Sequence, residues 1–164
     1  MDKTLGRLFQ AALRLNVALT RRPLLRAIEG RALTPFFVRF TRRIRGRPPA
    51  PVPPTVEALG REWERLLGNR RYAHVTEIDA ESQTVYGEIT GLCPLRGTGD
   101  VEACQRLMAY DRGLMAPYGA QFVVLASQAE AGRSSCRIAM RPATRDVSDL
   151  VPARQRLKRS LPLV

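Results

Sequence analysis

The seven-residue segment from Pro48 to Pro54 contains five prolines, and it is the feature that most constrains how this chain can fold. Proline has no amide N–H and a fixed φ, so such a segment cannot form a regular helix or an interior strand. It is typical of an extended, polyproline-type spacer. We therefore expect a spacer at residues 48–54 between an arm (residues 1–47) and a domain (residues 55–142), with a tail at residues 143–164.

Charge is distributed unevenly along the chain, and this supports the same division. The net charge is +12, and residues 1–50 carry 12 basic side chains against only Asp2 and Glu29. Residues 151–164 add four basic side chains, whereas residues 51–150 are nearly neutral, with 11 basic and 13 acidic ones. A chain of 164 residues has room for one ordinary domain and an appendage, which excludes an enzyme built of separate cofactor and substrate lobes.

The arm has the pattern of amphipathic helices. Its first half repeats apolar residues at helical spacing, and a second apolar run follows from Leu33 to Phe40. Arginines next to Phe36, Phe37 and Phe40 are typical of a helix that lies on an anionic membrane surface. Nucleic acid is a weaker alternative, because large apolar side chains occur throughout the arm. A third interpretation is that the helices pack on the domain and expose a solvated arginine face.

The chain has no signal peptide that we can identify, and no apolar run long enough for a transmembrane helix. Its odd number of cysteines argues against a disulfide-stabilised secreted domain. We therefore expect a cytoplasmic protein, peripheral to the inner face of the membrane if the arm binds lipid.

The domain is predicted to be α+β, a small antiparallel sheet of two hairpins with packed helices, preceded by the basic helical arm. Thr55 is expected to cap a helix that ends at Leu67, before Gly68. The first hairpin pairs residues 72–78 with 84–92, and the second pairs residues 121–126 with 134–140. A helix capped by Asp100 is expected over residues 101–112, and the tail after Pro142 is expected to be loose.

The chain has only three cysteines, and all of them lie in the domain: Cys93, Cys104 and Cys136. Asp111 follows Cys104 by seven residues, which is two helical turns and therefore the same face of a helix. One interpretation is a zinc site formed by the three cysteines with Asp111 or Glu102. Another is a cysteine nucleophile assisted by Asp111 as general base. The third is three buried core thiols.

Four short motifs around these residues resemble the L-2-amino-thiazoline-4-carboxylic acid hydrolase-like family. The motifs are Thr90-Gly91-Leu92-Cys93-Pro94, Glu102-Ala103-Cys104, Tyr110-Asp111-Arg112 and Ala131-Gly132-Arg133-Ser134-Ser135-Cys136-Arg137-Ile138. The match covers roughly residues 70–142. It implies hydrolysis of a small heterocyclic or amide-like substrate by water attack on an amidine-like carbon, with expulsion of sulfur. Cys93, Cys104, Asp111 and Cys136 are the catalytic positions that the resemblance implies.

The same family looks similar to the 4-vinyl reductase domain, a small-molecule-binding α+β module in which cysteines can hold zinc. This similarity implies an alternative function, a non-catalytic binding or sensory module in which the cysteines are structural. His74 is a further candidate for a general base. Tyr86, Tyr110 and Tyr118 are candidates to line a ligand pocket.

Overall fold

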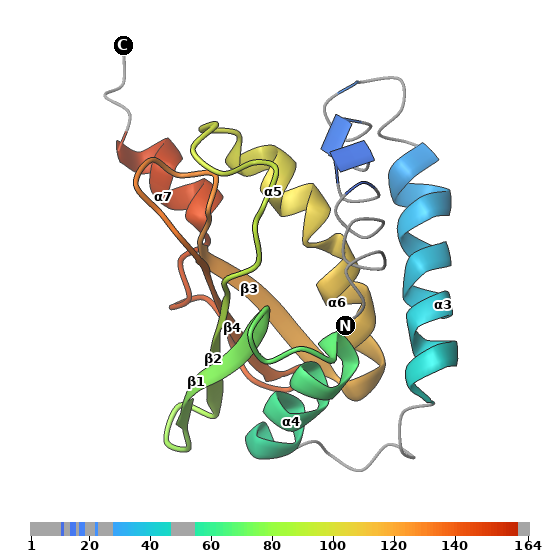
Figure 1. Ribbon diagram of the computed structural model, residues 1–164. Coiled ribbons are helices and arrows are strands. Elements are labelled where there is room, and N and C mark those ends of the chain that lie inside the picture. Colours follow the sequence, from blue (N-terminus) through green and yellow to red (C-terminus); the bar gives the residue numbers. More distant parts are fainter. Residues whose placement is uncertain are drawn as a thin grey trace.

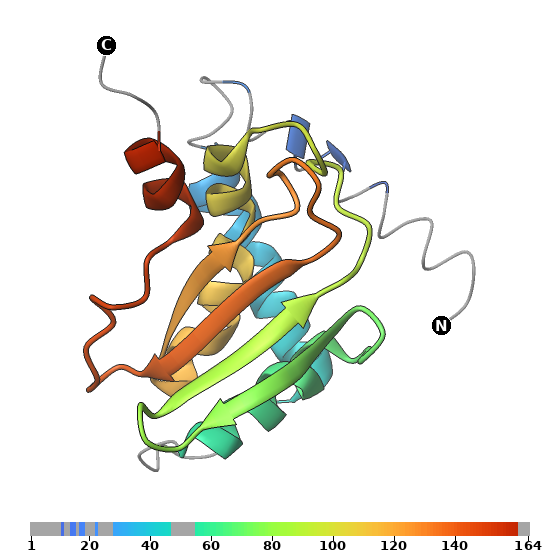
Figure 2. The ribbon, with the colours of Figure 1, turned by 90° about the vertical axis from the view of Figure 1, so that its left-hand side faces the viewer.

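The computed structural model describes residues 11, 14–15, 17–18, 22, 28–46 and 55–160. Within them, four antiparallel strands form one sheet in the order β1-β2-β4-β3, so that two hairpins pair through β2 and β4 (Figure 2). This sheet confirms the predicted α+β class. The strands are β1 (Ala73–Asp79), β2 (Thr84–Ile89), β3 (Ala120–Ala126) and β4 (Cys136–Pro142).

Helices α3, α4 and α6 are arranged in layers on one side of the sheet (Figure 1). α4 packs on β1, β2 and β4, α6 packs on β3, and α3 packs on the outer side of α6. None of the described helices covers the opposite face, which is turned toward the viewer in Figure 2. The helices are α3 (Thr34–Arg45), α4 (Val56–Leu67), α5 (Val101–Leu107), α6 (Ala109–Met115) and α7 (Ala153–Ser160), with a π-helical turn at Glu29–Leu33 and a 3-10 turn at Ala116–Tyr118.

α4 has the boundaries that the sequence predicts, and for the expected reasons. The Thr55 side chain accepts the amide N–H of Ala58 at 3.2 Å and caps the first turn. Gly68 ends the helix in the left-handed conformation (φ 69°) and donates its N–H to the Glu64 carbonyl at 2.9 Å. Trp63 lies on the apolar face between these caps and is completely buried.

Gly87 in β2 provides the space in which Trp63 packs against the sheet. A Cβ atom at Gly87 would lie 2.6 Å from Cζ3 of the indole, so no larger residue fits without moving the ring. In β4, Cys136 and Ile138 point to the same side of the sheet as Gly87, because they pair with Ile89 and Gly87 respectively. The core between the sheet and α4 is therefore centred on this indole ring.

The helix expected at residues 101–112 is interrupted and also extends further. α5 ends at Leu107, and α6 continues from Ala109 to Met115, beyond the end predicted at residue 112. The amide of Met108 bonds the Cys104 carbonyl at 3.0 Å, and the amide of Arg112 bonds the Met108 carbonyl at 3.1 Å. Helical hydrogen bonds thus run across the interruption, and Asp111 stays near the Cys104 side of the segment.

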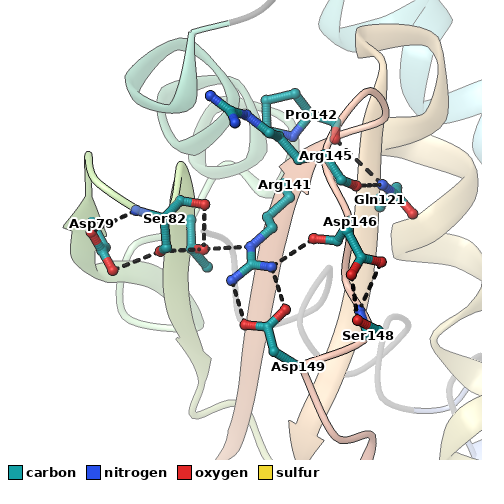
Figure 3. A network of polar contacts seen from close by, with 10 residues as sticks. Asp79, Ser82, Gln121, Arg141, Pro142, Arg145, Asp146, Ser148 and Asp149 are labelled. Atoms are coloured by element: carbon teal, nitrogen blue, oxygen red, sulfur yellow. Dashed lines mark hydrogen bonds and ion pairs between the residues drawn. The ribbon is translucent and has the colours of Figure 1, made fainter.

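The expectation of a loose tail is wrong for residues 143–160. Arg141 is buried and donates to Thr84 Oγ1 at 2.7 Å, to the Asp146 carbonyl at 2.6 Å and to both carboxylate oxygens of Asp149 at 2.5 and 2.8 Å (Figure 3). These bonds hold the segment after β4 against the end of the sheet, and α7 then packs on α5. The segment is therefore ordered by the hydrogen bonds of the Arg141 side chain to Asp146 and Asp149.

The spacer at residues 48–54 lies outside the described residues, as does most of the helix expected before Leu25. The second part of the predicted arm is helical, since α3 begins at Thr34 and extends to Arg45. In the part of the chain that the structure describes, no helix combines the length and apolarity needed to cross a membrane.

Candidate functional site

The thiols of Cys104 and Cys136 interact with each other in the core of the domain, and both are free cysteines. Cys104 lies in the first turn of α5, whose N-terminus is capped by Asp100, and Cys136 is the first residue of β4. The sulfur of Cys136 also accepts the buried amide N–H of Gln128 at 3.3 Å. Only 3% of Cys104 and 4% of Cys136 is exposed, so both thiols are shielded from solvent.

The two thiols of this pair differ in acidity. Hydrogen bonds from Cys136 and Ser127 lower the pKa of Cys104, and the positive charge of Arg112 acts in the same direction. The hydrogen bond to Cys104 and burial raise the pKa of Cys136 far above the ordinary thiol value. The pair therefore places its first negative charge on Cys104, the form in which sulfur is a nucleophile.

Cys93 lies close to this pair, in the segment that follows β2. Its sulfur accepts the amide N–H of Leu95 at 3.4 Å. Burial raises the pKa of Cys93, and the charge of Cys104 raises it further. Cys93 is half-buried and is thus the most accessible of the three thiols.

The side chain of Gln128 joins the segment before β4 to the loop that carries Cys93. Its amide nitrogen donates to the carbonyls of Ile89 at 3.0 Å and Gly91 at 2.9 Å, and its oxygen accepts Nε of Arg96 at 2.9 Å. Arg96 also donates to the carbonyl of Ser134 at 2.8 Å. Gln128 is completely buried, so these bonds form in a low-dielectric environment and hold both segments firmly.

Asp111 brings a buried carboxyl group to the same region. Its Oδ1 accepts the indole N–H of Trp63 at 3.3 Å. Burial raises the pKa of Asp111 to about 6, although Trp63 and Arg112 both act to lower it. The charge of Asp111 in turn raises the pKa of Cys104, so the two groups interact electrostatically. A carboxyl group with a pKa near 6 can both donate and accept a proton at neutral pH.

Tyr72, just before β1, also interacts electrostatically with these groups. Burial raises the pKa of its phenol strongly, and the charges of Asp111, Cys93 and Cys136 raise it further. The ring fits only because residue 91 is glycine, since a Cβ there would lie 1.9 Å from the ring. The phenol thus stays neutral at ordinary pH.

Cys104 and Cys136 interact directly, and weaker charge interactions link Cys104 to Cys93 and Asp111. The single cluster of Cys93, Cys104, Asp111 and Cys136 stays a prediction. The catalytic roles predicted for them stay predictions. Glu102, the other candidate ligand, is not part of the group, because it is exposed and pairs with Lys158 of α7 at 3.2 Å.

The other polar candidates lie elsewhere. His74 pairs with Glu88 and so faces the side of the sheet opposite to Cys136. Tyr86 is on that same opposite face, and the guanidinium carbon of Arg137 lies 5.1 Å from the centroid of its ring. Of the remaining tyrosines, Tyr110 is hydrogen-bonded to Thr41 and Tyr118 contacts Arg65.

Sequence reasoning missed Ser127, Gln128 and Tyr72 as parts of this site. Gln128 bonds the Cys136 sulfur through its main-chain N–H, a group that every non-proline residue has and that a sequence pattern cannot identify. A weak signal existed for Tyr72, because a tyrosine and a glycine flank the two ends of the predicted first hairpin.

No group of three or more His, Cys, Asp or Glu side chains among the described residues is arranged to hold a metal ion. All three cysteines are free thiols. The zinc role predicted for Cys93, Cys104 and Cys136 stays a prediction. A shallow pocket of about 160 Å³ lies between the N-terminal end of α5 and α7, and Glu102 and Lys158 are in its wall.

Comparison with known proteins returns no matching family model, no matching curated protein and no matching solved structure. The function has to be inferred from the chemistry of the site.

Proposed function

We propose that this protein is a hydrolase-like enzyme that opens a carbon–sulfur or carbon–nitrogen bond in a small heterocyclic or amide-like substrate. The observation that supports the proposal is a thiol of lowered pKa, Cys104, that interacts electrostatically with a buried carboxyl group of pKa about 6, Asp111. A nucleophile next to an acid–base group is what acyl- and amidine-transfer chemistry requires. The substrate class is the one implied by the resemblance to thiazoline-carboxylate hydrolases.

In the proposed first step, the Cys104 thiolate attacks the amidinium carbon of an amino-thiazoline ring. The ring carbon–sulfur bond then breaks, and the departing sulfur takes the proton of the Asp111 carboxyl group. The product stays attached to Cys104 through the attacked carbon. Cys136 supports this step, because its hydrogen bond stabilises Cys104 as the thiolate.

In the second step, water attacks the same carbon while the Asp111 carboxylate accepts a proton from it. The bond to Cys104 breaks, which restores the thiolate, and the proton first carried by the amidinium is released to solvent. The net reaction consumes one water and yields a ureido compound with a free thiol. Asp111 begins and ends the cycle protonated, a form that its raised pKa makes accessible near neutral pH.

Burial of the site determines how a substrate can reach it. Cys104 is only 3% exposed, so a substrate must displace covering side chains before it touches the sulfur. Cys93 is half-buried and its neighbour Leu92 is 56% exposed, which makes this segment the outermost part of the site. We assign Cys93 to substrate contact on this approach and not to nucleophilic attack, because burial raises its pKa.

The test uses L-2-amino-thiazoline-4-carboxylic acid and measures the appearance of free thiol. Cys104→Ala is expected to lower the turnover number at least about 1,000-fold, and Asp111→Asn about 100-fold or more. The matched control is Cys93→Ala, which removes a thiol from the same site and should mainly raise KM. Turnover that survives Cys104→Ala would refute the proposed nucleophile.

A second candidate function is a non-catalytic small-molecule-binding or sensory module, and the burial of Cys104 and Cys136 favours it. In that case the thiol pair stabilises the core, and replacing either cysteine by serine lowers the free energy of unfolding. Equilibrium urea unfolding of Cys104→Ser separates the two candidates. A stable but inactive variant supports the enzyme, and an unstable variant in a protein without turnover supports the binding module.

A further inference from the structure

Helix α3 is attached to the domain through one of its faces. Val38 is buried against α6, so closely that a Cβ at Gly113 would lie 2.9 Å from its Cγ2. Thr41 Oγ1 is hydrogen-bonded to the Tyr110 hydroxyl at 2.7 Å, which ties the same face to α6. Near the C-terminal end of α3, Arg65 of α4 donates to the carbonyl of Arg45. These contacts fix which side of α3 points outward.

The outward side of α3 is apolar and largely aromatic. It consists of Phe36, Phe37, Phe40 and Ile44, which are 59%, 39%, 51% and 63% exposed. Their spacing places them on one face of the helix, and we call this face the α3 stripe. The Phe36 and Phe40 rings stack with centroids 6.2 Å apart, and Phe36 meets Phe37 edge-to-face at 5.5 Å. The rings therefore form one continuous surface.

The concentration of apolar side chains on α3 is unusual within this molecule. Four of the nine large hydrophobic residues that are exposed in the described part of the chain lie in the α3 stripe. The sequence has only five phenylalanines, and three of them are in the stripe. Single exposed apolar side chains are ordinary on a protein surface, but a contiguous patch marks an interaction site.

Positive charge lies next to the stripe. Arg39 and Arg43 are one helical turn apart, they are exposed, and their spacing places them beside Phe36 and Phe40. α3 contains no acidic residue, and residues 1–50 carry a net charge of +10. The partner of this surface must therefore accept aromatic side chains and offer negative charge beside them.

We propose that the α3 stripe lies in the interface of an anionic phospholipid membrane, with the arginines on lipid phosphates. Aromatic side chains prefer the headgroup region of a bilayer, and each nearby basic residue adds attraction to anionic lipid. A second copy of the chain is a poorer partner, because two α3 helices in contact would bring like charges together. Nucleic acid would contact the arginines and leave the stripe in water.

The first experiment is co-sedimentation of the full chain with vesicles. Vesicles of phosphatidylcholine and phosphatidylglycerol in equal amounts are compared with pure phosphatidylcholine, at salt concentrations of about 0.1 M and about 1 M. We expect strong binding only to the anionic vesicles, weakened but not abolished at high salt, because the stripe is insensitive to screening. Equal binding to both vesicles, or no binding to either, would overturn the proposal.

The variant that tests the stripe is Phe36→Ser combined with Phe40→Ser, and it should lower vesicle affinity at least about tenfold. The matched control is Ile78→Ser combined with Leu92→Ser, since both residues are exposed and apolar but lie outside α3. This control should bind like the wild type. Both variants change only exposed residues, and emission from the single, buried Trp63 verifies that each one is folded.

A second measurement places the stripe directly. Phe40→Trp adds an indole at an exposed position, and on vesicle binding its emission should shift to the blue and be quenched by spin-labelled lipid. Unshifted emission on bound vesicles would mean that the stripe is not in the membrane. Binding to duplex nucleic acid that survives loss of the stripe, or self-association that depends on it without vesicle binding, would assign α3 to those partners instead.

Discussion

Trp63 donates its indole N–H to Asp111 at 3.3 Å, and both side chains are buried in the core of the domain. The bond stabilises the charged form of Asp111, yet burial outweighs it, so that the pKa of the carboxyl group is raised to about 6. A buried acid is thus held close to its point of ionisation with a neutral donor beside it. The stability of the folded protein must therefore depend on pH through this residue.

Asp111 should make the protein less stable as pH rises from about 4 to about 6. Its pKa is about 6 in the folded state and 3.8 ordinarily, so the folded protein binds more protons than the unfolded chain in this window. The Asp111→Asn variant mimics the protonated form at every pH. The free energy of unfolding of wild type relative to this variant should therefore fall by about 2 kcal/mol between pH 4 and pH 7.

The Asp149→Asn variant provides a control of opposite sign. Hydrogen bonds from Arg141 lower the pKa of Asp149, so its contribution is present above the ordinary pKa and is lost as pH falls. Wild type relative to Asp149→Asn should gain stability with rising pH. Chemical unfolding at several pH values measures both differences, and equal slopes for the two variants would contradict the assignment.

Cys136→Ala should raise the pKa of Cys104. The hydrogen bond from Cys136 is the largest of the effects that lower this pKa, and alanine removes the donor without introducing a new polar group. The measurement is the pH dependence of alkylation by iodoacetamide in a Cys93→Ala background, with and without Cys136→Ala. The same profile in both proteins would show that the two thiols act independently.

Gly87→Ala should destabilise the protein by about 1–3 kcal/mol, because the new methyl group overlaps the Trp63 ring. Displacement of the ring also weakens its bond to Asp111, so the tryptophan emission should change. Gly30→Ala is a matched control, since a Cβ there has no neighbour within 4 Å. Urea unfolding and fluorescence measure both effects, and equal stability of the two variants would contradict the packing argument.

Thr84→Val should lower stability by about 1–3 kcal/mol, because it leaves Nε of the buried Arg141 without its acceptor. Valine has nearly the same shape as threonine, so the loss can be assigned to the hydrogen bonds of Thr84 Oγ1 with Arg141 and Ser82. Thr76→Val is the control at an exposed strand position. Thermal unfolding measures the stability of both variants. If Thr84→Val is as stable as the wild type, Arg141 has found another hydrogen-bond acceptor.

The elements that the sequence predicts correctly depend on local signals. Thr55 and Gly68 mark the ends of α4 by chemistry that acts within four residues, and alternating β-formers mark the hairpins. Arg141 and Asp149 are eight residues apart and show no such pattern, so the order of residues 143–150 was missed. Their pairing depends on how the end of β4 meets Thr84 of another strand.

The cysteine group is partly predictable for a similar reason. The spacing of Cys104 and Asp111 on one helical segment suggested that they share a face, and the order of elements allowed Cys93 and Cys136 to approach them. The roles of Ser127 and Gln128 depend on where the second hairpin turns in space, which a pattern of residues does not encode. Gly87 is the clearest example of a role that the sequence does not reveal. A glycine inside a strand usually weakens it, but here the missing side chain leaves space for the Trp63 ring.

The strand order described above also says when the thiol pair forms during folding. Each hairpin joins neighbouring segments, whereas the central pairing of Ile89 with Cys136 closes a long loop and therefore comes later. Until then, the thiols of Cys104 and Cys136 are on separate pieces of structure and remain open to a labelling reagent. Loss of thiol labelling at Cys104 and Cys136 during refolding would therefore report the time at which β2 pairs with β4.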